Sequence, residues 1–148
     1  MIPLEIQFRI VSTVALVAWI FMWILPRSRM TEKIVLSGFV CLLLSGFYAL
    51  RVFIAMNFGD LEKFQSLSGF MSLLQSPQAA LAGWIHYLAF DLVVGILILR
   101  DSKRYEIPHP FLLVPLVLTF MVGPLGLIFY WILRTFWKRN PHLSFEKE

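Results

Sequence analysis

Four long apolar runs constrain the fold of this chain more than any other feature of its sequence. They cover residues 4–25, 33–56, 77–99 and 111–135. About 20 predominantly apolar residues are enough to carry an α-helix across the hydrocarbon core of a bilayer. The chain is 59% hydrophobic and 15% charged, whereas soluble domains average about 45–50% and about 25%. We therefore predict an integral membrane protein.

The connections between these runs predict how the helices are arranged. Short loops join the first run to the second and the third to the fourth, which favours antiparallel neighbours. The predicted fold is all-α: a single membrane domain over residues 1–148, built as a four-transmembrane-helix antiparallel bundle. Trp131, Trp137, Lys138 and Arg139 should anchor the far end of the fourth helix.

The connection between the second and third runs is the longest one. Its apolar residues recur at helical spacing after Asp60, which predicts an interfacial helix over residues 60–74 with its apolar face toward lipid. A loop packed over the end of the bundle is the alternative. The following helix has a clear start signal, because the Ser76 hydroxyl can cap it and Pro77 suits its first position.

Charge and N-terminal sequence bear on partners and location. The net charge of +4 is scattered without a basic run, so cationic residues flanking membrane spans explain it better than nucleic acid binding does. The first apolar run is longer than the roughly 7–15 residues of a signal-peptide core and lacks a small-residue cleavage site. It also lacks an Arg- and Ser-rich transit extension, as a bacterial chain or an already mature one would, and we expect a multi-pass protein of a bacterial inner membrane.

Two ionisable residues, His86 and Asp91, lie deep in the third run. A charged side chain near the middle of a membrane helix costs about 2.5–3.5 kcal/mol on insertion scales, so such groups usually face protein or a water-filled cavity. At about 1.5 Å of rise per residue, Thr119 of the predicted bundle lies near the level of Asp91. Tyr48 and Pro124 lie near the level of His86. These residues predict a polar site inside the bundle.

Helical geometry limits how one ligand could use these side chains. Trp84 and Tyr87 share a face with Asp91, whereas His86 lies about 140° around the helix from Asp91. One ligand could touch both ionisable groups only in a cleft between neighbouring helices. A metal site is not expected, because neither HxxxH nor HxxxD spacing occurs in the sequence.

Arg51 in the second run is the obvious counter-charge for Asp91. It lies nearer the end of its helix and would have to reach inward by most of its length. Snorkelling to the interface, or pairing with Asp60 or Glu62, is an equally good interpretation. Asp91 itself has a structural alternative, as a buried polar contact that holds helices together.

A Gly-Pro-x-Gly segment at residues 123–126 interrupts the fourth run at the level of His86. Pro124 has no N–H, so the carbonyl of Phe120 loses its helical partner and the helix should kink. Irregular backbone in a membrane is tolerated where it meets protein or lines a cavity, which would suit a lipidic substrate. Glycine and proline also tune packing in ordinary membrane helices, and this remains the alternative.

Three segments of the chain resemble one known family. They are WIHYLAFDLVVG at residues 84–95, PH at residues 108–109 and TFMVGPLGL at residues 119–127. Together they are similar to the abscisic-acid-deficient-4-like family, and the likeness covers nearly the whole chain in length and span order. Plant members of this family are plastid membrane proteins required to make neoxanthin from violaxanthin. The resemblance implies a neoxanthin synthase-like protein with a carotenoid or another isoprenoid as its ligand.

The reaction implied by this resemblance is an isomerisation. An epoxide is opened by proton donation, and loss of a proton from the polyene then gives an allene without redox change. This chemistry needs an acid and a base but no cofactor. Asp91 is assigned as the acid and His86 as the base, and the reverse assignment is equally allowed. The predicted substrate-binding residues are Trp84, Tyr87, Tyr48, Arg51, Thr119 and Pro124, of which the first two would face the polyene.

Two other classes of function compete with an isomerase. The chain could be a non-catalytic membrane protein that binds an isoprenoid or carotenoid, or that scaffolds a partner enzyme. It could also be a proton-coupled carrier that uses Asp91, although so short a chain would then need to form a homo-oligomer. The sequence contains no P-loop, Rossmann, zinc or nucleophile-elbow pattern, which argues against a nucleotide- or metal-dependent enzyme.

Overall fold

The structure is a computed structural model that describes residues 2–55 and 58–138. Within these residues, every regular element is helical. Three helical segments in the described part of the chain are long and apolar enough to cross a membrane: Leu4–Ile24, Thr31–Ile54 and Pro77–Arg104. Of the residues used in the predictions, Met56 and Arg139 lie outside the described residues, as do the side chains of Asp60 and Lys138.

The chain forms two compact units, which are described separately below. Helices α1 (Leu4–Ile24) and α4 (Pro77–Arg104) contribute residues to both units. The single-domain organisation stays a prediction. Unit 1 consists of Met1–Leu16 and Val40–Phe90, and unit 2 consists of Val17–Phe39 and Asp91–Glu148.

The first predicted helix is confirmed, as α1 over Leu4–Ile24. Pro3 precedes it, and the Pro3 carbonyl accepts hydrogen bonds from the N–H groups of Ile6 and Gln7. Pro26 follows its end, where a proline disfavours helical backbone in the residue before it. Local sequence therefore determines both ends of α1.

The second predicted helix, over residues 33–56, is interrupted in the structure. A π-helical turn, η1 (Thr31–Val35), precedes α2 (Phe39–Ala55). Gly38 lies between them with φ +84°, a conformation that glycine adopts without the Cβ clash of other residues.

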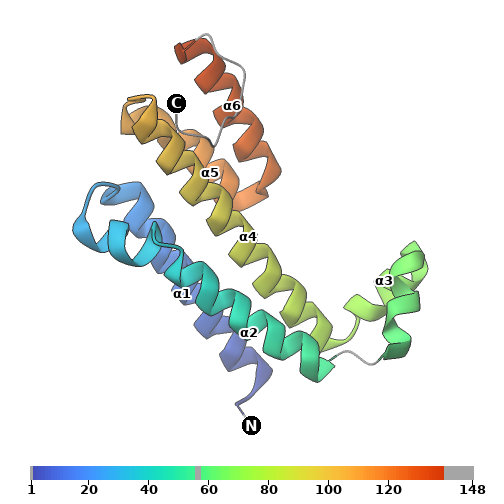
Figure 1. Cartoon of the computed structure of the whole chain (residues 1–148). Helices are drawn as coiled ribbons and strands as arrows, with labels where there is room; N and C mark the ends of the chain where they lie inside the picture. The colour runs from blue at the N-terminus through green and yellow to red at the C-terminus, as the bar shows by residue number, and fades with distance from the viewer. Residues whose placement is uncertain (1, 56–57, 139–148) are drawn as a thin grey trace. The chain divides into compact units, whose positions relative to one another are not determined.

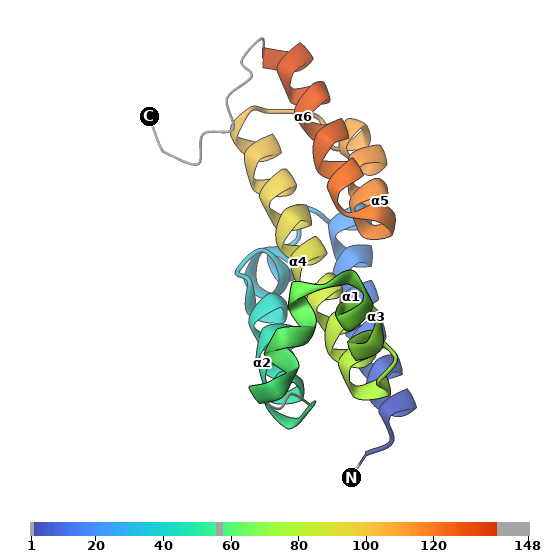
Figure 2. The same cartoon turned by 90° about the vertical axis from the view of Figure 1, so that its right-hand side faces the viewer.

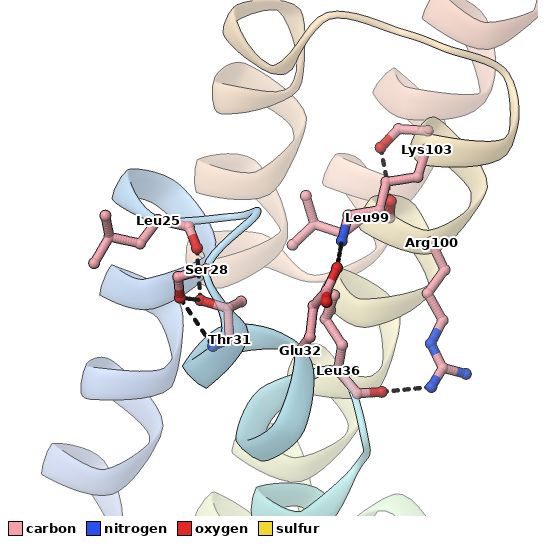
Figure 3. Close-up of polar contacts among 9 residues, drawn as sticks. Leu25, Ser28, Thr31, Glu32, Leu36, Leu99, Arg100 and Lys103 are labelled. Carbon is pink, nitrogen blue, oxygen red and sulfur yellow. Dashed lines mark hydrogen bonds and ion pairs between the residues drawn. The ribbon is translucent and has the colours of Figure 1, made fainter.

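Hydrogen bonds hold the connection before α2 in place (Figure 3). The Thr31 hydroxyl donates to the Leu25 carbonyl at 2.6 Å, and the Thr31 N–H donates to the Ser28 hydroxyl at 3.0 Å. Thr31 is fully buried. The chain between the first two helices is therefore ordered by its own polar groups.

The connection between the second and third predicted helices was interpreted either as an interfacial helix over residues 60–74 or as a loop. In the structure it is helical, but it forms two short helices rather than one. They are η2 (Phe58–Gln65) and α3 (Leu67–Leu74), which pack against each other (Figure 2). Ser66 caps α3 by accepting a hydrogen bond from the Gly69 N–H at 3.1 Å. Leu67 and Met71 expose apolar side chains, as an interfacial segment would, and its place at the membrane surface stays a prediction.

The third predicted helix starts as expected and ends later. α4 begins at Pro77. The Ser76 hydroxyl donates a hydrogen bond to the side-chain oxygen of Gln78 at 3.0 Å. At its other end, α4 continues past the predicted Leu99 to Arg104.

Contacts of the charged residues account for this extension of α4. Lys103 pairs with Glu32 at 2.9 Å, and Arg100 donates a hydrogen bond to the Leu36 carbonyl (Figure 3). Both partners belong to the segment that leads into α2. The charged residues therefore dock the end of α4 in unit 2 instead of ending the helix.

The prediction of one kinked membrane helix over residues 111–135 is wrong. The chain forms α5 (Leu113–Val122), preceded by η3 (His109–Leu112), and then reverses direction at Gly123 into α6 (Pro124–Lys138). The two helices run side by side in opposite directions (Figures 1 and 2). Neither reaches the roughly 20 residues needed to cross a bilayer. The fourth run is therefore a helical hairpin.

Small residues allow the two helices of the hairpin to approach closely. Gly123 has φ +25° and ψ −84°, and Pro124 occupies the first position of α6, where its missing N–H is not needed. A Cβ added to Gly126 would overlap the backbone of Thr119. The Gly-Pro-x-Gly segment thus makes a reversal, with one glycine for the turn and one for the helix contact.

We expect Gly123→Ala to lower the free energy of unfolding by about 2–5 kcal/mol, the sum of a left-handed backbone term and an overpacking term. The second term arises because a Cβ on Gly123 would fall 2.5 Å from the Oδ1 atom of Asp91. The measurement is reversible unfolding in mixed micelles of increasing dodecyl sulfate content. Gly38→Ala is the control, because a Cβ at Gly38 meets open space and should cost only about 1–2 kcal/mol. Equal losses in the two variants would contradict the packing of Asp91 at the turn.

Candidate functional site

His86 lies at the mouth of an apolar cavity of about 270 Å³ in unit 1. Residues of α2 and α4 line its walls, and residues of η2 and α3 cover one side. Tyr48 and His86 are the lining side chains that can exchange a proton. The apolar lining residues are Val52, Phe64, Phe70, Leu73, Leu74, Ala79, Ala82 and Gly83.

The imidazole of His86 contacts two aromatic rings. Its centroid lies 5.3 Å from that of the Tyr48 ring and 4.6 Å from that of the Phe90 ring. His86 is exposed and Tyr48 is half-buried, so the cavity opens at the surface of unit 1. Because His86 lies nine residues after Pro77, about 14 Å along the helix axis, this opening would be deep in the bilayer.

Trp84 and Tyr87 do not line the cavity that holds His86. The indole N–H of Trp84 donates to the Ser12 hydroxyl of α1 at 2.9 Å. The Trp84 ring also packs against Phe8 and stacks on Tyr87, with centroid distances of 5.3 and 5.5 Å. In unit 1 these aromatic residues connect α4 to α1.

Asp91, Thr119 and Pro124 belong to unit 2 and lie at the hairpin. Asp91 is buried, and its carboxylate lies against Gly123 at the reversal. Thr119 is fully buried, and its hydroxyl donates to the Pro115 carbonyl one turn earlier at 2.8 Å. The Gly123 carbonyl at the reversal accepts hydrogen bonds from the N–H groups of Gly126 and Leu127 in the first turn of α6. The structure therefore groups these three residues around the turn between α5 and α6.

Arg51 is buried in unit 1, with its guanidinium 5.4 Å from the centroid of the Phe47 ring. It lines a groove other than the His86 cavity. Among the described residues of unit 1, no carboxylate forms an ion pair with it, which removes Glu62 as the partner. The pairing of Arg51 with Asp91 stays a prediction.

Sequence reasoning missed a buried polar cluster in unit 2. Asp101 Oδ2 accepts hydrogen bonds from the Tyr130 hydroxyl at 2.6 Å and from Arg134 Nε at 2.7 Å. The guanidinium of Arg134, which has no exposed surface, lies 4.1 Å from the centroid of the Tyr105 ring. The signal was present, because Arg134 follows an uncharged run and Tyr130 lies one turn before it. The cluster fastens α6 to the end of α4.

Two other motif residues have structural roles in unit 2. A Cβ on Gly95 would overlap the ring of Trp19, which is fully buried. Trp19 and Trp23 both pack on Phe120 of α5, with ring centroids 5.7 and 5.2 Å away. His109 Nε2 donates to the Trp23 carbonyl at 2.8 Å. These contacts explain a glycine and a histidine that the sequence motifs contain.

The chain was compared with protein families, curated proteins and solved structures. A family model described as ABA DEFICIENT 4-like matches residues 6–130. No curated protein and no solved structure matches the chain. Within residues 2–55 and 58–138, no group of three His, Cys, Asp or Glu side chains is placed to hold a metal ion.

Proposed function

Because the chain belongs to the ABA DEFICIENT 4-like family, we propose that this membrane protein isomerises an isoprenoid or carotenoid-like lipid by proton transfer in the His86 cavity. One observation carries the proposal. The two proton-exchanging side chains that line this apolar cavity, His86 and Tyr48, have ring centroids only 5.3 Å apart. An acid–base isomerisation needs two such groups within reach of one substrate.

The size and lining of the cavity indicate which part of a substrate it would hold. Its volume of about 270 Å³ lies just below the roughly 300–1,000 Å³ of pockets that bury drug-sized ligands. One ring of an isoprenoid fits this space better than a whole carotenoid does. The remaining hydrocarbon would leave through the open mouth, where His86 is exposed, and would stay in the bilayer.

The chemistry can be written with these two residues alone. The Tyr48 hydroxyl gives its proton to an epoxide oxygen as the carbon–oxygen bond breaks, which leaves an alcohol and a carbocation. Neutral His86 takes a proton from the adjacent polyene, and the electron pair of that C–H bond forms the new double bond. The imidazolium then returns a proton to the neighbouring tyrosinate. The substrate keeps all its atoms and its oxidation state, and the enzyme returns to its starting form.

This assignment differs from the sequence-based one in the partner of His86. Tyr48 shares the cavity with His86, whereas Asp91 belongs to unit 2 and packs at the turn between α5 and α6. A positioning role for Asp91 in the hairpin accounts for its burial without using it as an acid. The assignment of Asp91 as acid stays a prediction that a variant can test.

The ligand can be tested by extraction of the full chain in mild detergent, followed by mass spectrometry of co-purified lipids. We expect an isoprenoid or carotenoid with the wild type and with Gly83→Ala, because a Cβ on Gly83 makes only an ordinary contact, 3.8 Å from Leu74. Gly83→Phe should fill the cavity and lower the bound ligand at least about tenfold, the effect of losing roughly 1.4 kcal/mol of binding free energy. Equal amounts in all three proteins would exclude the cavity as the binding site.

A further inference from the structure

A second apolar groove lies in unit 1 between α1 and α2 and shares no lining residue with the His86 cavity. Its volume is about 770 Å³. We call it the Arg51 groove, after the charged residue at one end. Side chains that line its length include Ile10 and Val14 of α1 and Leu43 and Leu50 of α2, together with the bare backbone of Gly46.

The Arg51 groove continues into a more polar pocket of about 500 Å³. Gln7 and Arg51 line both spaces, so they lie at the junction. Ser76 and Gln78 add further hydrogen-bonding groups to the polar pocket. The combined space therefore has an apolar part and a polar part, as an amphiphilic ligand would require.

The two polar side chains at the junction are buried but incompletely satisfied. Arg51 is 6% exposed and Gln7 is 4% exposed. Among the described residues, Arg51 Nε and Gln7 Oε1 have no hydrogen-bond partner. A buried cation without a counter-charge is strongly destabilising. The groove therefore offers a site for an anion that the described residues of unit 1 do not supply.

The depth of the groove matches one leaflet of a bilayer. Arg51 lies three residues before the end of the membrane-crossing segment Thr31–Ile54, about 5 Å along the axis, close to the level of lipid phosphates. From Arg51 to Leu43 the groove extends about 12 Å along α2. This distance is comparable to half of the roughly 30 Å hydrocarbon core. A lipid of that leaflet could place its head at Arg51 and one tail in the groove.

We propose that the Arg51 groove binds an anionic phospholipid. The phosphate of the lipid accepts hydrogen bonds from the Arg51 guanidinium in the polar pocket, and one acyl chain of the lipid lies along α1 and α2. The site is separate from the His86 cavity, so neither proposal depends on the other. The bound lipid would supply the anion that Arg51 lacks among the described residues of unit 1. The stability of unit 1 would then depend on the content of anionic lipid in the membrane.

The test is titration of the full chain, in one detergent, with phosphatidylglycerol or phosphatidylcholine of identical acyl chains, followed by native mass spectrometry. We expect the wild type to bind phosphatidylglycerol at least about tenfold more tightly, and Arg51→Gln to lose this preference. Arg9→Gln is the matched control, since it removes the same charge from an exposed side chain of α1 and should keep the preference. Equal affinity of the wild type for both lipids would overturn the proposal, as would loss of the preference in Arg9→Gln.

A second variant keeps the test decisive if Arg51→Gln does not fold. A Cβ on Gly46 meets nothing within 4 Å, so Gly46→Leu should fold and place its side chain in the groove. It should weaken the binding of both lipids at least about tenfold, whereas Gly46→Ala should change neither by more than about twofold. Undiminished binding in Gly46→Leu would place the lipid elsewhere.

Discussion

Replacing His86 by alanine is expected to lower the rate of isomerisation by about 10²–10⁴-fold, the usual contribution of a positioned acid–base group. His86 is the proposed base and the route by which Tyr48 regains its proton, so its loss removes both steps. The measurement compares lipid and pigment profiles of cells that carry wild-type or His86→Ala protein at matched expression. The variant should remain folded in membranes, because His86 is exposed at the cavity mouth.

Two further variants separate the roles of the neighbouring groups. Tyr48→Phe keeps the ring contact with His86 but removes the hydroxyl, so it should retain ligand while losing conversion. Asp91→Asn should leave conversion per folded molecule unchanged if Asp91 only positions the hairpin. Lost conversion with unchanged stability would instead place Asp91 in the chemistry. Identical profiles for wild-type and His86→Ala cells, across every isoprenoid of the host, would favour a binding or scaffold protein over an enzyme.

Replacing Arg134 by leucine is expected to lower the free energy of unfolding by about 3–5 kcal/mol, the effect of breaking a buried ion pair by removing one partner. Asp101 would lose its cationic partner in a site where only 11% of its side chain is exposed. Replacing both residues by leucine, in the double variant Asp101→Leu with Arg134→Leu, should recover most of the lost free energy of unfolding. Apolar pairs often replace buried ion pairs without a loss of stability. Unfolding in mixed micelles would measure all three proteins.

The control for this experiment is another ion pair of unit 2. Lys103 and Glu32 form a largely exposed pair at 2.9 Å, and surface pairs contribute little to stability. Lys103→Met should therefore change the unfolding midpoint far less than Arg134→Leu does. Similar effects of the two variants would mean that the Asp101 cluster does not fasten α6 to α4.

The parts of the fold that local sequence determines could be predicted. Pro3 and Pro26 delimit the first helix, and Pro77 begins α4 as its position after Ser76 indicated. The hairpin could not be derived in this way. Pro124 predicts lost helical hydrogen bonding, but a kink and a full reversal share that signal. The choice depends on Gly123 and on distant contacts such as the one between Arg134 and Asp101.

The relative placement of the candidate site residues could be predicted only in part, for the same reason. The fixed rise of a helix brought Tyr48 to the level of His86, where the two rings are in contact. The same calculation of depth placed Thr119 and Pro124 on one continuous fourth helix. That assumption was wrong, because the chain reverses at Gly123. Sequence spacing showed which side of its helix Trp84 lies on, and we therefore expected it to face a substrate. Spacing could not show that its partner would be the hydroxyl of Ser12.

The reversal at Gly123 also changes the expected number of membrane crossings from even to odd. A chain with four crossings would return both of its ends to the same face of the bilayer. A hairpin whose second helix is fastened beside the end of α4, through Asp101 and Arg134, returns to the face from which it started. Because three segments of the described residues before the hairpin are long and apolar enough to cross a membrane, we expect the start of α1 and the end of α6 on opposite faces of the bilayer. Tags fused to these two helices would therefore report from different compartments.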